Sequence, residues 1–166
     1  MMISVCGPNE ATEQEYADAV AIGQAIAFAG DTVVCGGRQG VMEAVAKGAT
    51  EAGGTAIGIL PTYETRDANP FLTHRIPTGL GHARNTIVVA SGDAVIAVGG
   101  GFGTLSEIGL ALKMGKPVIH LNSWDLDSDR IAYFSDDDAS YTPAPSPTEA
   151  VRLAIDAVAR QAPGHG

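Results

Sequence analysis

The sequence is short of cysteine, of basic residues and of long apolar runs, and each shortage excludes a class of protein. Its two cysteines, Cys6 and Cys35, are too few for a disulfide framework, which favours a reducing, cytoplasmic compartment. Lys and Arg number 10 against 19 Asp and Glu, and a net charge of −9 disfavours nucleic acid or an anionic membrane as partner. No segment approaches the roughly 18 consecutive apolar residues of a membrane span. No basic segment begins a signal peptide either, so we expect neither feature.

Glycine, in contrast, is abundant, with 21 residues among 166. Because the glycines follow no triplet period, collagen is excluded, and they must serve turns, close packing or backbone contact with a ligand. A hydrophobic content of 45% suffices for one packed core and excludes a disordered chain.

Short apolar runs alternate with longer segments of helical spacing. The apolar runs predict strands at 3–6, 32–35, 55–60, 72–76, 93–98 and 117–120. The spacing predicts helices at 12–29, 41–52, 80–91, 104–114 and 146–161. The strands are apolar throughout rather than alternating, which is typical of parallel strands buried on both faces. The fold class is therefore α/β: a single doubly wound, Rossmann-like domain over residues 1–161, with a mainly parallel sheet and helices on both faces.

Three further expectations concern single segments. The strand at 93–98 is the most apolar and is expected at the centre of the sheet. Residues 121–145, which include the acidic run 136–138, are expected to form a solvated surface segment, and residues 162–166 a frayed terminus.

Two glycine-rich segments follow predicted strands and begin predicted helices, at 36–42 and at 99–104. Glycine leaves backbone N–H groups open to an anion, and a helix N-terminus adds partial positive charge. Either segment alone could serve only a tight turn, but two at the same edge of a parallel sheet favour a bound phosphate. Neither has the spacing of a dinucleotide fingerprint or a P-loop. The predicted ligand-binding residues are Gly7, Gly36, Gly37, Gly40, Val41, Met42, Gly100, Gly101, Phe102, Gly103 and Thr104.

The role of Glu107 has two interpretations. Thr104-x-x-Glu107 has the spacing of a helix capping box, as do Thr12-x-x-Glu15 and Ser146-x-x-Glu149, which favours a structural role. Its position one helical turn after the second glycine segment favours a carboxylate at a ligand site instead.

Arg84 is the second candidate for chemistry. It stands at the start of an apolar helix, where the helix dipole disfavours a cation, and its guanidinium could bind a phosphate through two hydrogen bonds. The alternative is an ordinary surface arginine, and Arg38 in the first glycine segment is expected to be solvated.

No metal site is predicted. The four histidines, His82 among them, have no zinc-ligand spacing. Asp125-x-Asp127-x-Asp129 begins like a calcium loop, but Arg130 replaces the required glycine and no glutamate follows at the right distance. Both cysteines are expected to be buried, inert thiols.

The segment 100–107, Gly-Gly-Phe-Gly-Thr-Leu-Ser-Glu, resembles the P-G-G-x-G-T-x-x-E signature of the Lonely Guy (LOG) family. Residues 36–45 resemble that family's G-G-G-x-x-G-L-M-x-x-V segment, and Arg84 falls where the family has the arginine of an R-K pair. The resemblance covers residues 1–121 and implies a Rossmann-like homo-oligomer, a dimer or tetramer. It also implies an enzyme that cleaves nucleoside 5′-monophosphates into free base and ribose 5-phosphate, with Arg84 and Glu107 as the catalytic pair.

Three departures qualify this resemblance: Gly99 replaces the signature proline, Asn85 the lysine and Ser106 a usual glutamate. With these features the chain looks closer to a branch of the superfamily that includes molybdenum cofactor carrier proteins, which implies binding of a pterin monophosphate without hydrolysis. Both functions need only a small phosphorylated partner and no resident cofactor. The bound molecule is accordingly an AMP-like nucleotide or the molybdenum cofactor.

Overall fold

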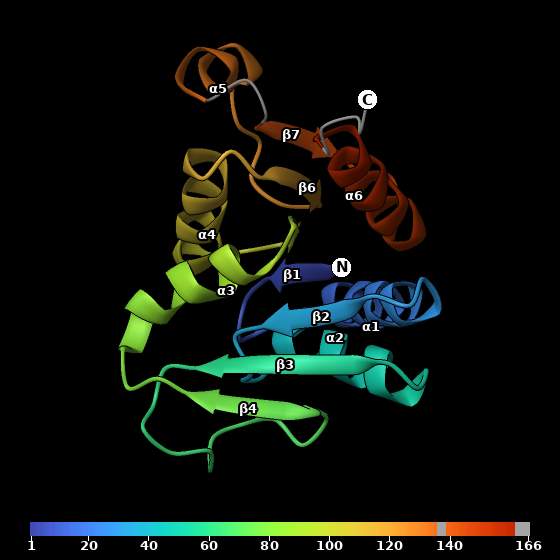
Figure 1. Ribbon diagram of the computed structural model, residues 1–166, viewed down its shortest axis with the longest axis vertical. Coiled ribbons are helices and arrows are strands. Elements are labelled where there is room, and N and C mark those ends of the chain that lie inside the picture. The colour runs from blue at the N-terminus through green and yellow to red at the C-terminus, as the bar shows by residue number, and fades with distance from the viewer. Residues whose placement is uncertain (136–138, 162–166) are drawn as a thin grey trace, which may run out of the picture.

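A computed structural model describes residues 1–135 and 139–161, so the expectations for 136–138 and 162–166 lie outside the described residues. Seven described strands form one parallel sheet in the order β4-β3-β2-β1-β5-β6-β7 (Figure 1). Their bounds are β1 Met2–Cys6, β2 Thr32–Cys35, β3 Thr55–Leu60, β4 His74–Pro77, β5 Ala94–Val98, β6 Pro117–Leu121 and β7 Ser140–Pro143. The predicted α/β fold with a parallel sheet is confirmed.

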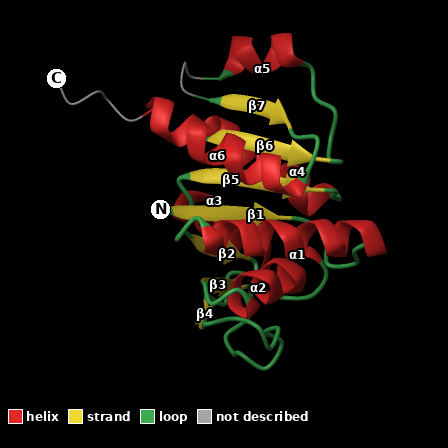
Figure 2. Cartoon of the chain, turned by 90° about the vertical axis from the view of Figure 1, so that its right-hand side faces the viewer, coloured by secondary structure: helices red, strands yellow, loops and turns green. Residues whose placement is uncertain are grey.

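Helices cover both faces of this sheet. Their bounds are α1 Glu13–Phe28, α2 Val41–Glu51, α3 Asn85–Ser91, α4 Phe102–Lys113, α5 Ser128–Phe134 and α6 Pro147–Gln161, and the 3-10 turn η1 Gly81–Arg84 precedes α3. Helices α1, α2 and α6 pack on one face, toward the viewer in Figure 2, and α3 and α4 pack on the other. None of the described helices is long and apolar enough to cross a membrane.

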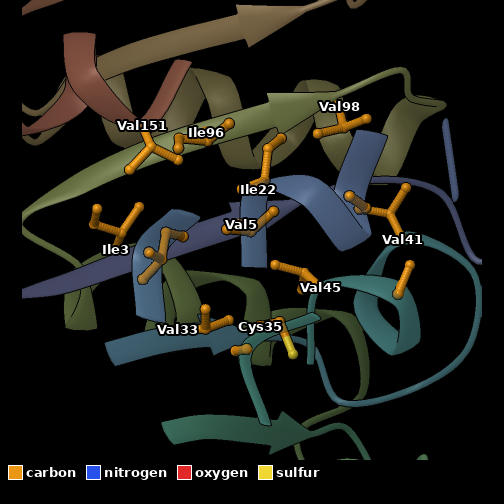
Figure 3. Packing of buried hydrophobic residues seen from close by; sticks show 14 of the residues in the cluster. Ile3, Val5, Ile22, Val33, Cys35, Val41, Val45, Ile96, Val98 and Val151 are labelled. Carbon is orange, nitrogen blue, oxygen red and sulfur yellow. The ribbon is translucent and has the colours of Figure 1, made fainter. Parts of the chain in front are cut away.

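The larger core lies between the sheet and the first of these helical layers. Figure 3 shows Ile22 of α1 and Val45 of α2 in one cluster with Val5 and Val33 of the sheet. All four side chains are fully buried. This burial on both sides of the sheet explains why the inner strands read as continuous apolar runs.

The prediction that the strand at 93–98 is central was wrong. The central strand is β1, and β5 lies beside it. Every residue of β5 is nevertheless buried, because helices cover both faces there. Uniform apolarity therefore reports coverage by helices and not the order of the strands.

The segment 121–145 also contains more structure than expected. It includes α5, which has no buried residue, and β7, an edge strand with no fully buried residue. Elements that bury so little carry a weak hydrophobic pattern, so the sequence did not predict them.

The three predicted capping boxes differ in outcome. Thr12 and Glu15 form a complete box at α1. At α6, Ser146 Oγ accepts from the Glu149 backbone N–H at 3.3 Å, while the Glu149 carboxylate pairs with Arg152. The box at Thr104 was wrong, because α4 begins two residues earlier, at Phe102, and Gly101 occupies the N-cap position.

The order of the strands determines where a ligand site can lie. From β1 the chain builds β2, β3 and β4 on one side and then returns to build β5, β6 and β7 on the other. The carboxyl ends of β2, β1 and β5 are therefore neighbours at a topological switch point, where parallel α/β sheets bind ligands. The two glycine segments follow β2 and β5 and flank the end of β1.

Candidate functional site

A cavity of about 520 Å³ opens at this switch point, within the range of roughly 300–1,000 Å³ typical of small-molecule sites. Residues from both glycine segments line it, as do residues that follow β1 and β3. Of the predicted site residues, those that line the cavity are Gly7, Gly36, Met42, Arg84, Gly101, Gly103, Thr104 and Glu107.

The other predicted ligand-binding residues do not line this cavity. Gly37 packs on Leu60, Gly40 turns with a φ of +63° beside the backbone of Pro8, and Gly100 packs on Thr104. The Val41 N–H donates to the carbonyl of Pro8 at 3.1 Å, which fixes the start of α2. Phe102 is 83% exposed, with its ring 5.9 Å from that of Trp124.

Arg84 is buried rather than a surface residue, with only 9% of its area exposed. Its Nη1 donates to Asn85 Oδ1 and its Nη2 donates to the carbonyl of Gly36 at 3.2 Å. A Cβ on residue 36 would lie 2.6 Å from Arg84 Nη2, so a larger residue there would displace the guanidinium. Arg84 therefore reaches across from η1 to the segment that follows β2.

Asn85 connects the same arginine to the second glycine segment. The Asn85 Nδ2 group donates to Ser106 Oγ at 3.4 Å, and Ser106 Oγ donates to the carbonyl of Gly103 at 2.6 Å. Arg84 is thus tied to both glycine segments. Sequence reasoning named Asn85 and Ser106 only as departures from a signature, since nothing local indicates that the two side chains meet.

Glu107 projects from the first turns of α4 into the cavity and is 6% exposed. Burial raises the pKa of its carboxyl to about 7, against the opposing effects of the Arg84 charge and a hydrogen bond from the Cys6 thiol. Burial also lowers the pKa of Arg84, which the nearby carboxylate partly offsets. Glu107 can therefore exchange a proton near neutral pH, which suits a residue that acts on a bound molecule.

Cys6 is a site residue that sequence reasoning missed. It lines the cavity, and burial raises the pKa of its thiol well above the ordinary value, so the thiol keeps its proton and donates to Glu107. Cys35 lies deeper, its pKa raised by burial to about 12 and its Sγ 3.6 Å from the Met42 carbonyl. The interpretation of both as buried, unreactive thiols agrees with these pKa shifts.

The expectation that Arg38 is solvated was wrong. Arg38 is half-buried, lines the cavity, and has its Nε shielded from solvent. Its backbone is fixed by Asn69, a 2% exposed residue whose Nδ2 donates to the Arg38 carbonyl at 2.9 Å. His82 also lines the cavity, next to Arg84 in η1.

One of the acidic residues after β6, Asp127, has a structural role. Asp127 caps α5, accepting from the Arg130 backbone N–H at 2.9 Å. In the described part of the chain, no group of three or more His, Cys, Asp or Glu side chains is placed to hold a metal ion.

Comparison with known proteins gives relatives of two kinds. The molybdenum cofactor binding protein of Rippkaea orientalis is 43% identical with a TM-score of 0.84, over 93% of this chain and 95% of that protein. The Moco carrier protein of Chlamydomonas reinhardtii is 34% identical with a TM-score of 0.84, over 96% and 98% of the two chains.

The second kind is an enzyme. A cytokinin riboside 5′-monophosphate phosphoribohydrolase of Rhodococcoides fascians is 36% identical over 61% of this chain, and the match spans only 54% of the enzyme. The resemblance to the LOG-like superfamily, with its molybdenum cofactor carrier branch, is confirmed by these relatives. Residues 1–151 match the SLOG cluster4 family, and the chain belongs to that family.

Proposed function

We propose that the cavity binds a small phosphorylated heterocycle, and that its occupant is the pterin monophosphate of the molybdenum cofactor, carried without chemical change. The observation that supports binding is Arg84: a 9% exposed cation on the cavity wall whose Nε has no hydrogen-bond partner among the described residues. Burial disfavours the positive charge of Arg84, and an anionic ligand beside the guanidinium would offset that cost.

The choice of pterin rests on the solved structures and on the side chains at the site. The cofactor-binding relatives are 43% and 34% identical to this chain and match it over more than 90% of both chains. At the site, the lysine and the glutamate of the nucleotide-cleaving signature are replaced by Asn85 and Ser106.

In this function the residues bind and orient rather than react. Arg84 and the backbone N–H groups of Gly101, Gly103 and Thr104 would hold the phosphate at the start of α4. The ring would lie along Gly7, Gly36 and Met42, between the two glycine segments. Glu107, with its raised pKa, would be a hydrogen-bond partner of the ligand in either protonation state.

Hydrolysis of a nucleoside 5′-monophosphate is the second candidate, favoured by the buried pair of Arg84 and Glu107 in one cavity. Cleavage of an N-glycosidic bond needs a carboxylate to stabilise the positive charge that develops at the anomeric carbon. Glu107 is the one carboxylate among the described residues that line the cavity.

Mass spectrometry of small molecules released from the native protein, with titrations of molybdopterin and AMP, tests the proposal. A released molybdopterin species and tighter binding of molybdopterin than of AMP support carriage. Release of adenine from AMP by the wild type, and its loss in Glu107→Gln, would replace carriage with hydrolysis. Binding of neither molecule would overturn the whole proposal.

A further inference from the structure

Two guanidinium groups line the cavity, and the nucleotide-cleaving signature accounts for only one of them. Arg38 stands in the loop after β2 and Arg84 in η1, 46 positions apart in the sequence, yet both line the same cavity. The carbonyl of Gly36, two residues before Arg38, accepts a hydrogen bond from Arg84. Arg84 thus contacts the loop that carries Arg38, and the two charges are close enough for Arg38 to add to the effect of burial in lowering the pKa of Arg84.

Both arginines keep the same atom unpaired. Among the described residues, the buried side-chain nitrogens and oxygens without a hydrogen-bond partner are the Nε atoms of Arg38 and Arg84. For Arg84 the other two nitrogens are already occupied, by Asn85 and by the Gly36 carbonyl, so its free donor is defined. Arg84 is buried and Arg38 is half-buried, and burial together with the charge of Arg38 lowers the pKa of Arg84. Two like charges that are partly removed from water beside one another indicate a site that is completed by an anion.

Two hydrogen bonds from Asn69 fix the backbone of the loop that carries Arg38. Asn69 holds the backbone on both sides of the Gly37–Arg38 bond: its N–H donates to the Gly37 carbonyl at 2.9 Å and its Nδ2 to the Arg38 carbonyl. These bonds use only backbone atoms of the loop. The Arg38 side chain is therefore left without any structural duty that the described contacts reveal.

The charges that face the two arginines do not neutralise them. Besides Arg38 and Arg84, the ionisable side chains on the cavity wall are His82, Cys6 and Glu107. Glu107 supplies at most one negative charge, against two permanent positive charges. The cavity is thus cationic within a chain whose net charge is −9.

We infer that Arg38 and Arg84 together grip one phosphate monoester dianion, so that the site selects a terminal phosphate over a phosphodiester. This inference rests on the proposed function, since it names the class of phosphorylated ligand. A monoester near neutral pH carries close to two charges and three terminal oxygens, which two guanidinium groups can share. A diester offers one charge and two such oxygens, and would leave one arginine unpaired.

The test uses methyl phosphate and dimethyl phosphate as probes that lack any ring. NMR of the arginine Nε–H groups follows each titration in the full-length protein, with signals assigned from the Arg38→Gln and Arg84→Gln variants. We expect methyl phosphate to shift both signals with a single dissociation constant and to bind at least tenfold more tightly than dimethyl phosphate.

Arg38→Gln is expected to weaken methyl phosphate binding about tenfold, dimethyl phosphate less than threefold, and so to remove most of the selectivity. Arg38→Lys, which keeps the charge but not the fork of donors, should fall between. Arg75→Gln, at an exposed position of the edge strand β4, is the control and should change neither constant. Thermal unfolding of each variant checks that it is folded.

The possible outcomes distinguish a failure of this inference from a failure of the proposed function. If methyl phosphate shifts the Arg84 signal but not that of Arg38, or if Arg38→Gln binds both probes like the wild type, the two-arginine grip is overturned and phosphate binding stands. If neither arginine signal responds to either probe, both the inference and the proposed function are overturned.

Discussion

Asn85 and Ser106 are in contact, with the Asn85 amide donating to Ser106 Oγ at 3.4 Å. These are the positions at which the LOG signature has a lysine and a glutamate. The two departures from the signature are therefore one coupled change, in which a pair of opposite charges gives way to a neutral hydrogen bond beside Arg84.

The coupling can be measured with a double-mutant cycle. Asn85→Lys puts a second cation against the buried Arg84 and should lower the free energy of unfolding by about 2 kcal/mol. Adding Ser106→Glu supplies the counter-charge, so the double variant should recover about 1 kcal/mol. Urea unfolding of the wild type, both single variants and the double variant gives the coupling energy. Strictly additive costs would contradict this explanation.

The raised pKa of Glu107 predicts how the free energy of unfolding depends on pH. Its pKa is raised from 4.5 in the ordinary state to about 7 in the folded protein, a difference worth about 3 kcal/mol. The unfolded chain loses this proton first as the pH rises, so the contribution is full below pH 4.5 and is lost as the pH passes through about 7.

Glu107→Gln removes this titration. Relative to the wild type, the variant should therefore gain up to about 3 kcal/mol of unfolding free energy between acidic pH and slightly alkaline pH. Denaturant unfolding of both proteins across this range measures the gain. A difference that stays constant with pH would show that the Glu107 carboxyl titrates normally.

Two glycines of α4 offer a matched pair that separates stability from binding. Beyond the neighbouring residues and the nearby backbone of α4 itself, nothing lies within 4 Å of the position of a Cβ at Gly103 or Gly109, but only Gly103 lines the cavity at the carboxyl edge of the sheet. Alanine at either position should raise the free energy of unfolding by about 0.5–1 kcal/mol. Only Gly103→Ala should weaken the binding of methyl phosphate, as measured by the same NMR titration. Equal loss of binding in both variants would argue against the cavity as the ligand site.

Gly99, the position of the signature proline, cannot hold a proline in this fold. Its φ is +56°, whereas proline requires a φ near −65°. A Cβ there would also meet the carboxylate of Glu15, which is occupied in the capping box of α1. Gly99→Ala should therefore cost about 2 kcal/mol or more of unfolding free energy. Thermal and urea unfolding measure the cost, and a neutral Gly99→Pro variant would contradict the described loop.

The sequence predicted the inner part of the fold because those elements bury their residues. β1, β2, β3, β5 and β6 have apolar runs that helices cover on both faces, and the pattern records this coverage. The edge strand β7 and the exposed α5 bury too little to leave such a record. The order of the strands is a property of long-range packing, which explains why β5 was assigned the place of β1.

The candidate site likewise contains residues that the sequence predicted and residues that it did not. Glycine at the ends of two strands, with Arg84 and Glu107 beside them, is a local pattern that can be read from spacing. Arg38 could not be recognised, because its shielding depends on a loop held by Asn69, about 30 positions away in sequence. Cys6 was missed for a similar reason: its bond to Glu107 joins β1 to α4 across the sheet.

The cationic cavity in an acidic chain has a kinetic consequence for the binding of any phosphorylated ligand. An anion that approaches from afar meets the net charge of −9 before it reaches the two guanidinium groups. At low ionic strength this repulsion extends over tens of ångströms, and dissolved salt shortens it to about 10 Å at 0.1 M. Added salt should therefore increase the association rate of the phosphate, although it weakens the affinity of the bound state. For a pair of oppositely charged molecules, in contrast, added salt slows association.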